Sequence, residues 1–151
     1  MNDFILAPGH PIRCLYFMVQ GELFIEVTQA FEELLISLAS RRPWVIDAPQ
    51  LVDYIDEFPD GSEVHTYGAA LQMYSASEPW RKTLPPQIDR YHLEEVTLIV
   101  EELCKLSLEL NCDFMLQYDD VYVGCIKNGI TDESIRIGLL DEWQKMLDQS
   151  K

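Results

Sequence analysis

The strongest constraint on the fold is a run of apolar residues at helical spacing in the second half of the chain. These residues are separated alternately by four and three positions: His92, Val96, Ile99, Leu103, Leu106 and Leu110. Positions with this period lie along one side of an α-helix, so the run predicts a long helix laid on a core. Asp89, just after Pro85-Pro86, is expected to cap its start, and Asn111 to end it in the left-handed conformation.

Strand-like segments lie on both sides of this helix. Runs rich in β-branched and aromatic residues predict strands over 12–19, 64–74, 114–118 and 121–126. Turn residues separate or follow these runs at Pro59-Asp60-Gly61, Asp119-Asp120 and Asn128-Gly129. Gly68 is expected to bend the second of these strands.

The first third of the chain predicts a hairpin, a helix and a segment that fits two structures. Gln20-Gly21 predicts a turn into a further strand over 23–27, followed by a helix that Thr28 caps. The apolar residues of that helix follow the helical period at Phe31, Leu34, Leu35 and Leu38. Residues 48–58 fit two structures: Asp47, Pro49 and Gln50 favour a helix start, and the same stretch also fits an edge strand.

The end of the chain predicts one more helix. Thr131 or Asp132 is expected to cap it, and its inner face is formed by Ile135, Leu139, Trp143 and Met146. No Gly/Ser-rich linker or repeat divides the sequence, so residues 1–151 are expected to form a single domain. The prediction is an α+β domain, in which an antiparallel sheet of about five strands carries helices packed mainly on one face.

Charge and cysteine content limit the environment and the partners. The 151 residues include 11 Lys and Arg against 26 Asp and Glu, a formal net charge of −15, which argues against a nucleic-acid partner. No apolar segment is long enough to span a bilayer, so we expect no membrane partner. The four cysteines, at positions 14, 104, 112 and 125, form no CxxC pair, and we expect free thiols in a cytoplasmic protein.

Sequence motifs for catalysis are missing. The chain has no Gly-x-Ser-x-Gly, P-loop or dinucleotide fingerprint, so we predict no catalytic residue and no cofactor. His92 and Glu95 are three positions apart on the long helix and could face one metal ion. A carboxylate-bridged di-metal site needs a Glu-x-x-His pair from each of two helices, and this chain has one pair in the reverse order, so we predict no metal ligand.

The most distinctive stretch combines acidic and aromatic side chains. Between Trp44 and Thr66 there are six acidic residues and no Lys or Arg. Acidic residues beside aromatics are typical of surfaces that attract and anchor a basic protein. The predicted partner-binding residues are Trp44, Asp53, Tyr54, Asp56, Glu57 and Asp60.

These observations favour a non-enzymatic, acidic protein-binding module. In size, charge and texture the chain resembles short bacterial proteins, some of which are immunity proteins that neutralise a toxin, but this likeness assigns no residue. The resulting hypothesis is an immunity-type inhibitor of a basic toxin or nuclease. Alternatives are a small enzyme or metal-binding protein that uses carboxylates with His92 or His65, a subunit of a homo-oligomer, and an acidic stretch that serves solubility alone.

Overall fold

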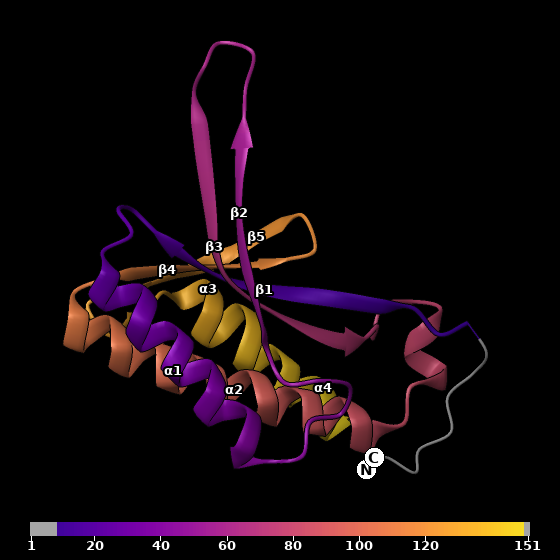
Figure 1. Ribbon diagram of the computed structural model, residues 1–151. Coiled ribbons are helices and arrows are strands. Elements are labelled where there is room, and N and C mark those ends of the chain that lie inside the picture. The colour runs from indigo at the N-terminus through magenta and orange to yellow at the C-terminus, as the bar shows by residue number, and fades with distance from the viewer. Residues whose placement is uncertain (1–8, 150–151) are drawn as a thin grey trace.

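The computed structural model describes residues 9–149, and its longest element is the predicted helix (Figure 1). This helix, α2, spans Pro86–Leu110. The prediction that Asp89 caps it was wrong: the helix begins at Pro86, because proline suits the first helical position, where no backbone N–H is needed. The predicted end is confirmed, since Asn111 has φ 55° and ψ 47° and its N–H donates to the Ser107 carbonyl.

The apolar stripe of α2 faces the core, as its spacing predicts. The buried members of the stripe have exposed fractions between 0% and 8%: His92, Val96, Ile99, Leu103 and Leu106. The opposite side of the helix carries exposed residues, among them Leu108 at 69%. The stripe therefore covers one face of the sheet.

The sheet has six strands in the order β2-β3-β1-β4-β5-β6, and every neighbouring pair is antiparallel. The strands are β1 Ile12–Gln20, β2 Gln50–Glu57, β3 Glu63–Tyr74, β4 Asp113–Tyr118, β5 Val121–Lys127 and β6 Ile130–Thr131. The predicted α+β class is thus confirmed, with one strand more than the expected five. The predicted strands over 12–19, 64–74, 114–118 and 121–126 are all present.

Residues 23–27 are not a strand, which corrects the first predicted hairpin. Helix α1 spans Ile25–Arg41, begins three residues before Thr28, and has Phe24 at its cap without a side-chain hydrogen bond. The reason is packing: Val27, Phe31 and Leu38 are buried along one side of the helix, so Val27 belongs to the helical stripe.

Residues 50–57 form strand β2 at the edge of the sheet, so the helical interpretation of 48–58 was wrong and the strand alternative holds. β2 pairs with β3 along its whole length, from Gln50 opposite Ala70 to Glu57 opposite Glu63. The predicted turn closes this ladder, with Gly61 at φ 89°. A continuous ladder outweighs the weak helix-start signal of Asp47, Pro49 and Gln50.

The C-terminal helix contains a π-helical segment that changes its buried face. Asp132 caps the short α3, Glu133–Ile135, and its carboxylate accepts from the Ile135 N–H. The π-helical segment Arg136–Asp141 follows, and then α4, Glu142–Gln149. The wider π turn shifts the helical face, so Leu147 is buried where Met146 was predicted, and Met146 is 37% exposed.

The helices gather on one side of the sheet and leave the other side uncovered (Figure 1). Successive side chains of a strand alternate between faces, so Leu15 and Phe17 of β1 point to the helices while Tyr16 and Met18 point away. All four cysteines are free, with Cys112 buried and the other three half-buried. Within residues 9–149, no helix has the length and apolar character needed to cross a bilayer.

The buried stripe of α2 generates a stability prediction. Leu103 is 1% exposed, so Leu103→Ala should lower the free energy of unfolding by about 2–5 kcal/mol through lost burial and a residual cavity. Leu108→Ala, on the exposed side of the same helix, should change it by less than about 0.5 kcal/mol. Urea denaturation of both variants measures the difference, and equal losses would show that the helical face is wrongly assigned.

Candidate functional site

The β2–β3 hairpin extends beyond the rest of the sheet (Figure 1). β3 pairs with β1 only from Tyr74 back to Gly68, whereas its pairing with β2 continues to Glu63. Residues 53–66 therefore have sheet partners only within their own hairpin, and we call this segment the arm. The arm holds five of the six predicted partner-binding residues, all except Trp44.

Gly68 marks the point where the arm leaves the sheet. A Cβ atom at this position would overlap the carbonyl oxygen of Phe17 and the Cα of Met18 in the neighbouring strand. Only glycine allows β3 to approach β1 so closely. Figure 1 shows β3 changing direction between the arm and the sheet, and Gly68 is the first residue of β3 that pairs with β1.

Tyr67 anchors the base of the arm to helix α1. Its hydroxyl donates to a Glu32 carboxylate oxygen at 2.6 Å and lies 3.2 Å from the Thr28 carbonyl oxygen. The ring is buried, with its centroid 5.7 Å from that of Phe31. Burial raises the pKa of Tyr67, and the hydrogen bond to Glu32 raises it further, so the hydroxyl remains a donor at neutral pH. The arm therefore starts from a fixed point.

Beyond this anchor, the arm presents acidic and apolar side chains to solvent. Its large apolar residues are about half exposed: Tyr54 at 51%, Ile55 at 54%, Phe58 at 48% and Val64 at 51%. Its acidic residues are Asp53, Asp56, Glu57, Asp60 and Glu63, and it contains no Lys or Arg. The arm is thus an exposed surface that is both apolar and strongly negative.

Strand register divides these side chains between two faces. Tyr54 and Asp56 share one face, and Asp53, Ile55 and Glu57 lie on the other. On the second face His65 Nε2 lies 2.6 Å from an Asp53 oxygen. The predicted partner-binding residues of β2 therefore cannot all contact a flat partner surface from one side.

The turn at the tip is held by Asp60. Its carboxylate accepts from the Ser62 hydroxyl at 2.6 Å and from the Ser62 backbone N–H at 2.9 Å. These hydrogen bonds lower the pKa of Asp60, so it is a stable negative charge at neutral pH. Asp60 therefore combines a structural role in the turn with a contribution to the charge of the arm.

A hollow of about 640 Å³ lies between the arm and the uncovered face of the sheet. Its lining includes aromatic and apolar side chains of three strands: Tyr16, Met18, Val52, Tyr54 and Met115. Burial raises the pKa of Tyr16, with a further contribution from Cys14. The hollow places Tyr54 beside Tyr16, Met18 and Met115, which are not among the predicted partner-binding residues. The alternation of strand 12–19, together with helices on one side only, is the signal that identifies them.

Trp44 does not belong to the arm. It follows α1, is half-buried against the core, and its indole N–H donates to the Leu38 carbonyl at 3.0 Å. The Arg42 guanidinium lies 5.8 Å from the centre of its ring. Trp44 therefore stabilises the end of α1, and Tyr54 is the exposed aromatic residue among the six predicted.

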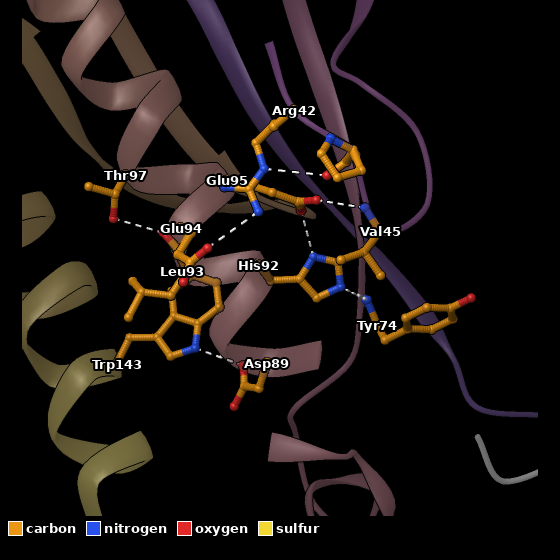
Figure 2. A network of polar contacts seen from close by, with 11 residues as sticks. Arg42, Val45, Tyr74, Asp89, His92, Leu93, Glu94, Glu95, Thr97 and Trp143 are labelled. Atoms are coloured by element: carbon orange, nitrogen blue, oxygen red, sulfur yellow. Dashed lines mark hydrogen bonds and ion pairs between the residues drawn. The ribbon is translucent and has the colours of Figure 1, made fainter. Parts of the chain in front are cut away.

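His92 and Glu95 form a buried hydrogen-bonded pair in α2, each about 1% exposed (Figure 2). The Tyr74 backbone N–H donates to His92 Nε2 at 3.1 Å, and an amide nitrogen can only donate. The proton of the neutral ring is therefore on Nδ1, which donates to Glu95 Oε1 at 2.8 Å. Glu95 Oε2 accepts from the Val45 N–H at 2.7 Å. The pair joins β3 and the chain after α1 to the long helix.

One alternative from the sequence is an enzyme or metal site that uses His92. Both ring nitrogens and both Glu95 oxygens already have partners within the protein. His65, the other histidine considered, is exposed on the arm and bonded to Asp53. In the part of the chain that the structure describes, no group of three or more His, Cys, Asp or Glu side chains could hold a metal ion.

The buried pair generates a second stability prediction. Glu95→Gln replaces one acceptor oxygen by an NH₂ group that faces a donor. The free energy of unfolding should therefore fall by about 1–3 kcal/mol. Its neighbour Glu94 has a side chain 52% exposed, and Glu94→Gln should cost less than about 1 kcal/mol. Chemical denaturation of the two variants compares them. An equal loss would mean that the buried pair is not specifically required.

Comparisons with known proteins do not add a family assignment. No family model, no curated protein sequence and no solved structure matches this chain. Function is therefore inferred from the geometry of the molecule itself.

Proposed function

We propose that the protein is a non-enzymatic binding module for a basic protein, and that it acts as an immunity-type inhibitor of a basic toxin or nuclease. The observation that carries this proposal is the arm: it extends beyond the core and presents five acidic and four half-exposed apolar residues, with no Lys or Arg. Apolar side chains grouped on a protruding element are typical of interaction sites.

The charge of the arm favours a basic partner over a second copy of the chain. Two arms side by side would bring together ten carboxylates, five from each. Like charges placed opposite each other in neighbouring strands are unfavourable. Lys and Arg side chains of a partner would instead be attracted to the arm, and attraction of this kind accelerates association.

The free edge of β2 supports binding by strand addition. β2 is the last strand on its side of the sheet, so alternate backbone N–H and C=O groups along its outer edge have no strand partner. An extended basic segment could pair with this edge and place alternate side chains beside Tyr54 and Asp56. The hollow beside Tyr54 would receive an apolar side chain of the partner.

The role of the arm's charge in binding can be tested by capturing a partner protein and measuring how fast it associates. Asp53, Asp56, Glu57 and Asp60 are changed together to the corresponding amides, which keep the hydrogen-bond acceptor of Asp60 for Ser62. A basic protein captured by the wild type should associate with this variant about tenfold or more slowly at low salt, because steering charges govern the on-rate. Surface plasmon resonance at increasing salt measures the effect.

The matched control neutralises four exposed acids on the helices, Glu101, Glu109, Asp141 and Asp148, and so changes the net charge equally. This control should retain most of the wild-type on-rate. A salt-independent on-rate, or an equal effect of both fourfold variants, would mean that the arm does not direct binding. Thermal melts of all three proteins confirm that each one folds.

The Tyr54 side chain should slow the dissociation of the bound partner. Its side chain is 51% exposed and borders the hollow, so a partner would bury it on binding. Tyr54→Ala should raise the off-rate of the captured partner by about tenfold or more, since anchoring aromatics hold complexes together. The control is Tyr91→Ala, an exposed tyrosine on α2. Equal off-rates for both variants would exclude Tyr54 as an anchor.

A further inference from the structure

A second cleft, of about 230 Å³, lies on the helix-covered side of the sheet. Its lining comes from β1, β3, β4, the start of α2 and the C-terminal helical segments, and it shares no residue with the hollow beside the arm. Most of its walls are apolar or aromatic: Leu15, Met73, Tyr118, Leu139, Trp143 and Met146. The π-helical segment contributes Gly138 and Leu139, and π turns are frequent at functional sites.

One carboxylate in this apolar cleft lacks a cationic partner. Asp89 is 8% exposed and lines the cleft from the first turn of α2. Its Oδ1 accepts from the Trp143 indole N–H at 2.7 Å (Figure 2). In residues 9–149 no Lys, Arg or His nitrogen forms an ion pair with Asp89. A buried carboxylate normally needs a charged partner or several hydrogen bonds.

The other charges near the cleft leave this negative charge in place. Glu142 also lines the cleft, and no Lys or Arg does. Arg81 and Lys82 line the neighbouring hollow, which Asp89 also borders, and Arg81 Nη1 lies 3.8 Å from the sulfur of Met146 in the cleft wall. Neither cation forms an ion pair with Asp89. The N-terminus of α2 offsets part of the charge through the helix dipole. At the position of Asp89 itself a cation would therefore be favoured over an anion.

We propose that this cleft binds a small organic amine in its protonated form. The ammonium group donates to Asp89, and the apolar body of the ligand packs between Met73, Leu139 and Met146. The rings of Tyr118 and Trp143 add further apolar surface to the walls of the cleft. The apolar walls and the single buried carboxylate suit a primary amine on an aryl or alkyl body better than a metal ion, which needs several converging ligands.

The first test compares three probes of similar shape and different charge: phenethylamine, 2-phenylethanol and phenylacetate. Each is titrated into the full-length protein while ¹H–¹⁵N spectra follow the Trp143 indole N–H, which donates to Asp89. Trp143→Phe assigns that signal by removing one of the three indole peaks. Phenethylamine should shift the signal saturably and bind about tenfold or more tightly than 2-phenylethanol, since charge-assisted hydrogen bonds are the stronger ones. Phenylacetate should not bind.

The second test removes the charge and keeps the shape. Asp89→Asn retains an oxygen that can accept from Trp143. The substitution should therefore weaken the binding of phenethylamine about tenfold or more and leave the affinity for 2-phenylethanol unchanged. The matched control is Glu26→Gln, which also removes an acid from the first turn of a helix but lies exposed on α1. It should bind both probes like the wild type.

Two results would overturn the proposal. The first is that the wild-type protein binds phenethylamine no more tightly than 2-phenylethanol. This comparison does not depend on how any variant folds. The other is a folded Asp89→Asn variant with unchanged affinity for phenethylamine. Neither result bears on the arm, which binds its partner on a separate surface.

Discussion

The burial of α2 against one face of the sheet is the interaction on which the rest of the structure depends. Its stripe of buried side chains brings the central strands and the other helices into one core. Because all the helices cover the same face, the opposite face has no cover, and β2 and β3 extend past the last helix that could support them. The exposed arm and the hollow beside it follow from this one-sided packing.

Side-chain hydrogen bonds complete the structure where secondary structure ends. Glu95 and His92 accept from the backbone N–H groups of Val45 and Tyr74. Tyr67 donates to the Glu32 carboxylate of α1, and Trp44 donates to a backbone carbonyl of the same helix. Each of these polar groups is placed in a buried or half-buried position and has a partner there, as stable interiors require. His92 is therefore explained by its structural role, although its spacing from Glu95 first suggested a ligand pair.

Periodic patterns in the sequence were sufficient to predict most of the fold. The stripe of α2, the left-handed Asn111 and the strands on either side of the helix were all predicted, because each depends on local spacing or turn chemistry. Three details were not: the start of helix α1, the choice between helix and strand for β2, and the last buried residue of α4. Packing of Val27, pairing with β3 and the π-helical turn decide them. The acidic residues of the arm could be selected from composition. The sheet residues beside Tyr54 and the cleft at Asp89 required the tertiary arrangement.

The isolation of the arm has a consequence for local stability. Hydrogen bonds between β2 and β3 beyond Gly68 have no third strand beside them, so they can open without disturbing the core. Amide hydrogens of the arm should then exchange with solvent through local opening, whereas those of the buried stretch of α2 exchange only when the whole domain unfolds. The molecule is thus divided into a slow-exchanging body and a fast-exchanging hairpin, and protection of that hairpin reports directly on whatever covers it.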